Sequence, residues 1–324
     1  MVVTGGALAE FERVGVTFGG GVRALDDVSL AVPRGGILGL VGESGSGKTT
    51  LCRTLLGLTP PAEGRVTFDG RPVGDWLRGD ARAFRRRVQM LLQDAVASLS
   101  PRMTIGRALE EPLLIHRLPL EEGRARLAGL LRRLGLPSDI AGKYPHQVSG
   151  GQARRIGVAR ALVMQPGMIV ADEPTAGLDV SVQGDLLNLL LDLRAELGLT
   201  YLVVSHNLHV VRRVTERTAV MYLGQVVEEG PTRAIFARPA HPYAAALVAA
   251  SPGLREAPGR RRIVLRGEIP SVLNPPPGCR FHTRCPAAQP DCAAVPPALR
   301  EVAPDRTARC HYPFSLALPG GPAA

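Results

Sequence analysis

The residues with the clearest capacity for chemistry form one short glycine-rich stretch. It follows the apolar run 37–41, precedes a helical pattern, and reads Gly42-Glu43-Ser44-Gly45-Ser46-Gly47-Lys48-Thr49. Glycines at these spacings allow a tight turn that brings backbone N–H groups against a polyphosphate, whose charge the next helix N-terminus favours. In the pattern G-x-x-x-x-G-K-[ST], Lys48 would reach the phosphates and Thr49 would hold Mg²⁺. The stretch predicts a nucleoside triphosphate site, because the plain alternative of a loop with a surface lysine does not explain the flanking strand and helix patterns. It does not separate kinases, GTPases, motors and transporters.

A second candidate group is acidic. Asp172 ends the apolar run 168–171, and Glu173 follows on the predicted turn. A phosphate-binding loop that hydrolyses ATP needs one acidic group near Mg²⁺ and another that polarises the attacking water. We therefore assign the metal to Asp172 and the general base to Glu173. An Asp-Glu pair after a strand is more often a solvated turn, but its place after a buried run and downstream of the glycine-rich loop favours catalysis.

A third candidate is the start of another helix, at Ser149-Gly150-Gly151-Gln152. Ser149 suits an N-cap, and a helix N-terminus opened by glycines attracts anions through its N–H groups and dipole. The alternative is an ordinary cap followed by a flexible glycine pair. The tetrapeptide alone does not decide between these two interpretations.

The surrounding pattern indicates an α/β fold. Apolar runs at 88–92, 168–171 and 201–205 alternate with helical stretches, which is typical of a parallel sheet covered by helices. Short alternating strands at 8–32 predict an antiparallel β layer, and 94–150 predicts a separate helical subdomain. Beyond residue 252 the chain is rich in proline and arginine, which indicates an appendage.

Composition limits the class of protein. The chain has 324 residues, 45% of them hydrophobic and 21% charged, which is ordinary for a globular protein. Its apolar runs are shorter than a membrane span and its N-terminus shows no secretion pattern, so we expect a cytoplasmic location. The net charge of +10 comes from arginines spread along the chain, apart from groups at 78–87 and 260–262. The arginine preference of a genome with biased composition explains this charge most simply, and a basic surface that faces a membrane is the second interpretation.

Taken together and in order, these motifs resemble the ATPase subunit of an ABC transporter. The set consists of Gly42 to Thr49, Gln93, Ser149 to Gln152, Met168 to Asp172, Glu173, Ala176-Gly177-Leu178-Asp179 and His206. The resemblance implies a P-loop ABC ATPase domain at 8–235 with a RecA-like core, an antiparallel β layer and a helical subdomain at about 94–150. A small cysteine-containing C-terminal region at 236–318 and a frayed tail at 319–324 would follow.

The resemblance also implies roles for individual residues. Phe18 would stack on adenine, Gln93 would sense Mg²⁺ and the membrane partner, and Asp179 would cross to the other subunit. The implied catalytic residues are Glu173, His206, Gln93 and Lys48, and the implied Mg²⁺ ligands are Thr49, Gln93 and Asp172. ATP would be bound by Phe18, Gly42, Glu43, Ser44, Gly45, Ser46, Gly47, Lys48, Thr49, Thr50, Gln93, Ser149, Gly150, Gly151, Gln152, Asp172, Asp179 and His206. In this family two ATPase domains sandwich two nucleotides, so one chain supplies half of each site.

A narrower resemblance covers nearly the whole chain. The motifs that carry it are similar to those of oligopeptide/dipeptide importer ATPases and include Ser98-Leu99-Ser100-Pro101, Asp179-Val180-Ser181-Val182-Gln183, His241-Pro242-Tyr243 and Asn274-Pro275-Pro276-Pro277-Gly278-Cys279. This implies a motor for peptide import at the cytoplasmic face of the cell membrane. Its partners would be a second, different ATPase chain, two transmembrane permease subunits and, through them, an extracellular substrate-binding protein. Nickel and glutathione importers share these motifs and remain alternatives.

The C-terminal cysteines admit several interpretations. Cys279, Cys285, Cys292 and Cys310 have a spacing unlike that of common zinc ribbons, and disulfides are rare in the cytoplasm. Four thiolates suit a 4Fe-4S cluster, which some importers similar to this chain carry in this region. Zinc, or a loop that binds nothing, are the alternatives. Cys52, on the helix after the glycine-rich loop, is most simply a core residue.

Departures from the family pattern are local: Ala95, Val96, Ala153, Gly177 and Asn207 replace more usual residues. None removes a catalytic atom, so they bear on coupling and subunit contact. A function of a different class, a soluble ABC protein acting on nucleic acid, is suggested by the isoelectric point near 10.1. Such proteins usually carry tandem ATPase domains or long coiled-coil insertions, neither of which is visible here, so we expect no direct contact with nucleic acid.

Overall fold

The computed structural model describes residues 6–251, 263, 265 and 267–316. The described chain folds into two compact units, namely unit 1 (residues 74–204) and unit 2, which contains the segments before and after it. The tail expected to fray at 319–324 and the basic run 260–262 lie outside the described residues.

Unit 2 begins with an antiparallel sheet in the strand order β2-β1-β4-β5. Its strands are β1 (Ala7–Phe18), β2 (Val22–Pro33), β4 (Glu63–Phe68) and β5 (Arg71–Pro72). Phe11 pairs with Leu30 on one side and with Val66 on the other, and all three side chains are buried. Alternating apolar residues thus face one core, as expected of a sheet with one solvated face. The antiparallel β layer predicted at 8–32 is confirmed and is extended by β4 and β5.

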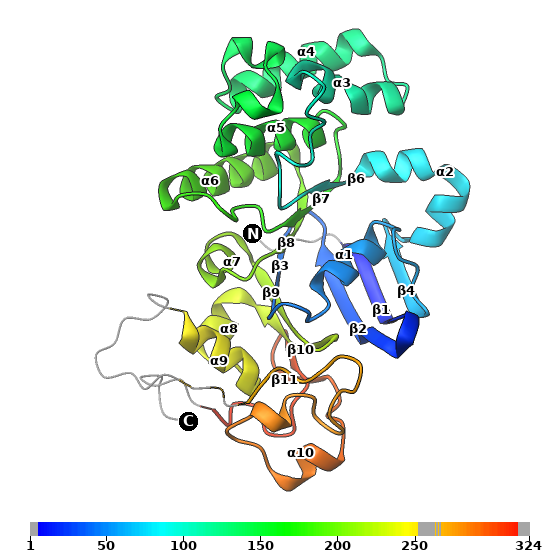
Figure 1. The fold of residues 1–324 in the computed structure, drawn as a ribbon. Helices are drawn as coiled ribbons and strands as arrows, with labels where there is room; N and C mark the ends of the chain where they lie inside the picture. Colours follow the sequence, from blue (N-terminus) through cyan, green and yellow to red (C-terminus); the bar gives the residue numbers. More distant parts are fainter. Residues whose placement is uncertain (1–5, 252–262, 264, 266, 317–324) are drawn as a thin grey trace. The chain divides into compact units, whose positions relative to one another are not determined.

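A second sheet in unit 2 carries the glycine-rich loop. Strand β3 (Ile37–Val41) runs parallel to β9 (Arg217–Tyr222), which pairs antiparallel with β10 (Gln225–Pro231). The C-terminal region adds β12 (Arg306–Ala308) next to β10 and then β11 (Arg300–Ala303), two strands that the sequence pattern did not predict. The helices of this unit are α1 (Lys48–Leu55), α7 (Leu208–Val214), α8 (Thr232–Ala237), α9 (Pro242–Ala250) and α10 (Pro290–Ala294), as Figure 1 shows.

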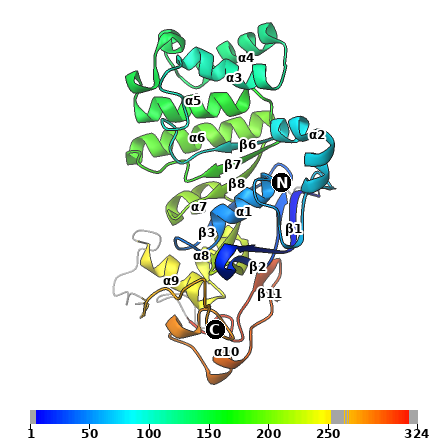
Figure 2. The same ribbon diagram turned by 45° about the vertical axis from the view of Figure 1, so that its right-hand side comes forward.

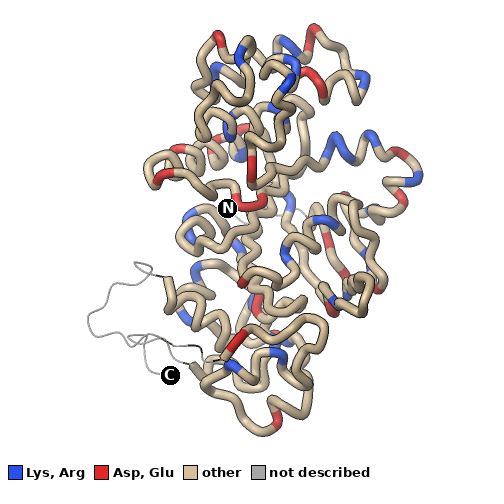
Figure 3. The backbone as a smooth tube through the Cα atoms, in the orientation of Figure 1, with Lys and Arg blue, Asp and Glu red and all other residues tan. Residues whose placement is uncertain are grey.

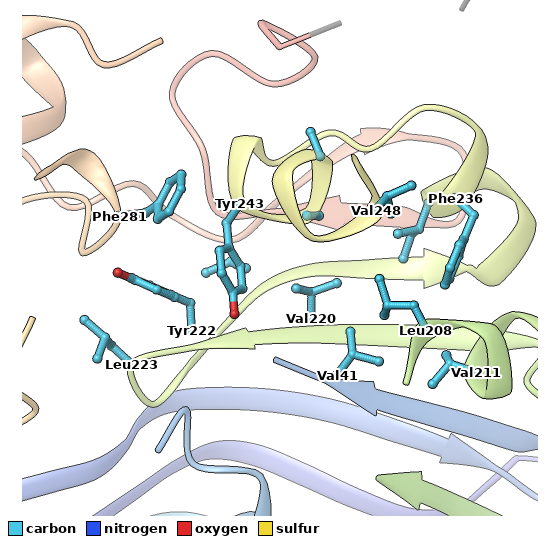
Figure 4. Close-up of a cluster of buried hydrophobic side chains, with 14 residues drawn as sticks. Val41, Leu208, Val211, Val220, Tyr222, Leu223, Phe236, Tyr243, Val248 and Phe281 are labelled. Carbon is cyan, nitrogen blue, oxygen red and sulfur yellow. The ribbon is translucent and has the colours of Figure 1, made fainter. Parts of the chain in front are cut away.

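The core of unit 2 joins the strand before the glycine-rich loop to the C-terminal region. Val41 of β3 and Val220 of β9 pack in one buried cluster with Tyr243 of α9 and with Phe281. In Figure 4 the rings of Tyr222, Tyr243 and Phe281 lie side by side at one end of this cluster. Their centroids are 4.6–5.4 Å apart, a range in which aromatic pairs attract one another beyond their area of contact. The C-terminal region is therefore part of this core.

Unit 1 contains three parallel strands, β6 (Val88–Leu91), β7 (Met168–Asp172) and β8 (Thr200–Val204), with β7 paired to both others. Strands β7 and β8 are buried apolar runs apart from Asp172 at the end of β7, which confirms the parallel sheet predicted from the sequence. The helices are α2 (Val73–Arg87), α3 (Ile105–Ile115), α4 (Leu120–Arg133), α5 (Gly150–Leu162) and α6 (Val180–Leu197). Figures 1 and 2 both show α3 and α4 packed beside α5. Helices α3 and α4 fall within residues 94–150, where the sequence predicts a helical subdomain.

Arginines concentrate on α2. Its last turn is Arg85-Arg86-Arg87, and Figure 3 shows Lys and Arg positions along this helix. Within the described residues no helix is both long enough and apolar enough to cross a membrane.

Candidate functional site

The glycine-rich loop runs from the end of β3 to the first residue of α1. Gly42 has φ 153° and Gly47 has φ 104°, a backbone region that side chains disfavour. A Cβ at Gly42 would lie 2.2 Å from the Met221 carbonyl oxygen, and one at Gly47 would lie 2.7 Å from the Ala24 carbonyl oxygen. The two glycines are required because the loop folds tightly against β9 and β2. This is the compact turn that the sequence predicted.

Lys48 closes the loop from within. Its Nζ donates to the carbonyl oxygens of Gly42 and Glu43, each at 2.8 Å, and to Ser46 Oγ at 3.2 Å. The ammonium therefore lies over the loop at the start of α1, where the helix dipole also favours an anion. The exposed Thr49 follows in the first turn of α1. The stretch from Gly42 to Thr50 thus forms one continuous cradle that suits a polyphosphate.

Two further predicted residues lie in unit 2. Phe18 is the last residue of β1 and its side chain is exposed, so its ring is accessible for stacking. His206 is also exposed and follows the buried Ser205. Asn207, one of the departures from the family pattern, caps α7: its Oδ1 accepts from the N–H of His209 at 3.0 Å. The substitution therefore keeps the helix start that follows His206.

The acidic pair lies in unit 1. Asp172 is the last residue of β7, and Glu173 follows in a left-handed backbone conformation with φ 49°. Glu173 is only 9% exposed, and its N–H donates to the Val204 carbonyl oxygen at 2.9 Å. A buried carboxylate in a strained backbone conformation is more typical of a functional position than of a solvated turn. This favours the catalytic interpretation of Glu173.

Arg154 holds this turn, and the sequence did not single it out. From α5 its guanidinium donates to the carbonyl oxygens of Glu173 at 3.2 Å and Pro174 at 2.9 Å, and also to that of Ala176. Burial lowers the pKa of Arg154 from its ordinary value, although a guanidinium remains protonated. Five donors in a fixed fork can satisfy several carbonyl oxygens at once, so Arg154 ties the turn after β7 to α5.

The remaining motifs of unit 1 lie at helix starts and after a strand. Ser149 caps α5 as predicted: its Oγ accepts from the Gln152 N–H at 3.2 Å, while Gln152 Oε1 accepts from the Ser149 N–H at 3.1 Å. Asp179 is the exposed N-cap residue of α6, and Gln183 Nε2 donates to the Leu178 carbonyl oxygen just before it at 2.9 Å. Gln93 lies exposed shortly after β6. Within unit 1, the turn 172–179 is thus held by hydrogen bonds from the side chains of Arg154 and Gln183.

The four C-terminal cysteines lie around one small cavity of about 10 Å³. Burial raises the pKa of the Cys285 thiol to about 11 and that of Cys310 to about 12, and it also raises the pKa of Cys279. In the part of the chain that the structure describes, no group of three or more His, Cys, Asp or Glu side chains is arranged to hold a metal ion. Cys52 is fully buried in the core, as predicted.

Comparison with known proteins gives the class. The family profile "ABC transporter" matches residues 25–176, and the profile "Oligopeptide/dipeptide transporter, C-terminal region" matches residues 227–292. Among solved structures, CbiO1 from Clostridium perfringens is 29% identical with a TM-score of 0.66, covering 72% of this chain and 91% of that one. The cassette MJ0796, determined as a dimer bound to ADP and Pi, is 32% identical with a TM-score of 0.63, covering 69% and 99%. The fold and the loop are those of an ABC ATPase.

Curated relatives narrow the class to a family. The probable peptide ABC transporter ATP-binding protein y4tS of Sinorhizobium fredii is 46% identical over 291 residues, which is 90% of this chain and 82% of the relative. The oligopeptide transport ATP-binding protein AppF of Bacillus subtilis is 44% identical over 296 residues, 90% of each. The chain belongs to the family of ATP-binding subunits of oligopeptide/dipeptide ABC transporters.

Proposed function

We propose that this chain binds Mg²⁺ and ATP and hydrolyses the ATP to energise import of oligopeptides or dipeptides through a membrane ABC transporter. The observation that carries the proposal is the cradle at Gly42 to Thr50, with Lys48 folded over its carbonyl oxygens, in a chain whose relatives are named as ATP-binding proteins of peptide transport. The nickel and glutathione importers are the second candidate, since the motifs are shared. The cargo is chosen by other chains of the transporter.

Each of the proposed site residues has its own role in ATP binding or hydrolysis. Lys48 and the loop N–H groups would bind the β- and γ-phosphates, and Phe18 would stack on adenine. Thr49, Asp172 and Gln93 would each be a ligand of Mg²⁺. Glu173 is the general base and His206 contacts the γ-phosphate. Mg²⁺ would neutralise the charge that develops on the transferred phosphoryl group. Each group acts by positioning or by charge, which is what phosphoryl transfer requires of a protein.

One chain supplies half of each site. The start of α5 at Ser149 to Gln152, of which Ser149 and Gly150 are exposed, and the exposed Asp179 would face a second ATPase chain and complete its glycine-rich loop. ATP therefore binds more tightly to the closed pair than to the open pair, and this difference in affinity drives two permease subunits between states. The permease receives cargo from an extracellular substrate-binding protein. The chain works at the cytoplasmic face of the membrane.

A groove in unit 1 suits the permease. It measures about 210 Å³, and its lining includes Leu92, just after β6, and Ile115 of α3, which are 49% and 60% exposed. Large apolar side chains exposed around a groove are typical of a docking site for an amphipathic helix. Gln93 follows Leu92 directly, so a permease helix in this groove would lie next to the residue proposed to sense Mg²⁺.

We also propose a 4Fe-4S cluster on Cys279, Cys285, Cys292 and Cys310, whose side chains would have to rearrange to hold it, because none of the described side chains is arranged around a metal ion. Its support is that the four thiols line one cavity and that backbone N–H groups hydrogen-bond their sulfurs, as Gln289 N–H does to Cys292 Sγ at 3.5 Å. Hydrogen bonds to sulfur tune such clusters, and iron binding would deprotonate thiols whose pKa burial has raised. Anaerobic purification followed by iron analysis and absorbance near about 400 nm tests it. Zinc in place of iron, or no metal, would refute it.

The base role is tested by Glu173→Gln. The variant keeps the size and hydrogen-bonding reach of the side chain but cannot accept the proton, so we expect ATP binding to be retained and turnover to fall by about a hundredfold or more. Gel filtration with ATP should show a stable closed dimer. An unchanged hydrolysis rate would remove Glu173 from the base role.

A further inference from the structure

Every polar group of Glu43, the second residue of the glycine-rich loop, has a partner. Its carbonyl oxygen accepts from Lys48 Nζ at 2.8 Å, within the loop. Its N–H donates to the hydroxyl of Tyr243 at 2.8 Å, and its carboxylate accepts from Arg284 through two bonds, Nη1 to Oε2 at 2.8 Å and Nη2 to Oε1 at 3.1 Å. Two of these three attachments come from residues 200 and 241 positions later in the chain.

Both C-terminal partners are rigidly placed. The side chain of Arg284 is 8% exposed, and its guanidinium carbon lies 5.9 Å from the ring centroid of Tyr222. Tyr243 is fully buried and packs against Tyr222 and Phe281 (Figure 4). A two-point ion pair held among packed aromatic rings loses little side-chain entropy and fixes direction as well as distance. Arg284 is therefore built to hold Glu43 in one geometry.

The segment that carries Arg284 is itself anchored to the core. Arg280 pairs with Asp26 of β2 and donates to the Leu223 carbonyl oxygen. The Cys279 N–H donates to the Cys292 carbonyl oxygen at 2.7 Å, which closes the loop between these cysteines. Displacement of this segment would thus pull on Glu43 directly.

We propose that Arg284 and Tyr243 are positioning residues for ATP binding, through which the C-terminal region holds the glycine-rich loop in its nucleotide-binding shape. They act on Glu43 and do not touch the nucleotide. The proposal rests on the proposed role of this loop in binding ATP. The physical reason is preorganisation: a loop that is already held in one shape loses less conformational entropy when the polyphosphate binds. The C-terminal region would accordingly set ATP affinity.

A double-mutant cycle tests this. The variants are Glu43→Gln, Arg284→Gln and the double substitution Glu43→Gln with Arg284→Gln, and the readout is the Kd for Mg-ATP, measured in the full-length chain by competition with a fluorescent ATP analogue. We expect each single variant to weaken binding by about tenfold and the double variant by no more than either single one, since residues that act as a pair are not additive. Tyr243→Phe, which keeps the ring and removes the hydroxyl, should weaken binding by about threefold.

The matched control is Arg309→Gln. Arg309 lies in the same C-terminal region, has a side chain that is also 8% exposed, and pairs at 3.0 Å with Asp27 instead of the loop. Its loss should lower the thermal midpoint while leaving the ATP Kd within about twofold, which separates positioning from general stability. Equal effects of Arg309→Gln and Arg284→Gln on the ATP Kd would overturn the proposal, as would additive effects in the cycle.

Failure of this inference is distinguishable from failure of the proposed function. If the unmodified chain does not bind Mg-ATP, both are refuted. If it binds and the Glu43 and Arg284 variants bind equally well, only the positioning role is refuted. Should Arg284→Gln fail to fold, Glu43→Gln and Arg284→Lys carry the test, because Glu43 is partly exposed and lysine keeps the charge but not the two-point geometry.

Discussion

His241 makes the stability of this protein depend on pH. It is fully buried, and burial lowers the pKa of its imidazole from 6.5 to about 3. Its Nδ1 accepts from the N–H of Tyr243 at 3.0 Å, which caps α9, so the folded state requires the neutral ring. Below pH 6.5 the unfolded chain binds a proton that the folded chain does not. The contribution is therefore complete above pH 6.5 and is lost as the pH falls toward 3.

The size of the effect follows from these two pKa values. Between pH 7.5 and pH 5 the unfolded state gains about 2 kcal/mol from protonating His241, at about 1.4 kcal/mol per pH unit below 6.5. Urea unfolding followed by circular dichroism at both pH values measures the total change. The matched variant is His241→Asn, whose Oδ1 can accept the same capping bond without titrating.

The comparison isolates His241, because the other titrating groups, such as the nearby Glu228, are present in both proteins. We expect the unmodified chain to lose about 2 kcal/mol more than His241→Asn between pH 7.5 and pH 5. The variant will differ in absolute stability because asparagine is smaller, so the readout is the change with pH. Equal losses in the two proteins would refute the assignment.

The remaining predictions concern one buried ion pair, the glycines of the loop and the arginine that holds the turn after β7. Arg306→Met leaves the buried Glu228 without its cation, so urea unfolding should show a free energy of unfolding about 3–5 kcal/mol lower. Adding Glu228→Gln should recover part of this loss, and an unchanged free energy of unfolding would contradict the burial of this pair. Gly42→Ala places a Cβ 2.2 Å from a carbonyl oxygen and should abolish ATP binding in a titration. Gly45→Ala meets no atom within 4 Å and is strained only by its backbone φ of 77°, so it should weaken ATP binding less than Gly42→Ala does. Arg154→Gln releases the turn after β7, so steady-state kinetics should show ATP hydrolysis at least about tenfold slower with unchanged ATP affinity. Weaker ATP binding at an unchanged rate of hydrolysis would contradict this role of Arg154.

The local parts of the fold and site were predictable from sequence. Continuous apolar runs identified β7 and β8, and the serine before two glycines identified the N-cap of α5. The glycine spacing identified the cradle at Gly42 to Thr50, because tight turns and helix starts depend on residues close together in the chain. Such features need no knowledge of the tertiary fold.

The interactions that tie the loop and the turn to the rest of each unit were not predictable. Arg284 reaches Glu43 across 241 positions, and Arg154 reaches the carbonyl oxygens after β7 across about twenty. An arginine in an arginine-rich chain carries no signal of which partner it will meet. Strands β11 and β12 are short and follow a proline-rich stretch, so their pairing with β10 arises from tertiary contact.

In the proposed mechanism this chain drives import by hydrolysing ATP. The most direct measurement is uptake of labelled peptides into vesicles that contain the transporter purified with this chain and its membrane partners, with ATP supplied on the side of the ATPase. We predict peptide accumulation that requires ATP and that Glu173→Gln abolishes, although the variant still binds ATP. Uptake that continues with Glu173→Gln, or ATP hydrolysis without any uptake of peptide, would contradict it.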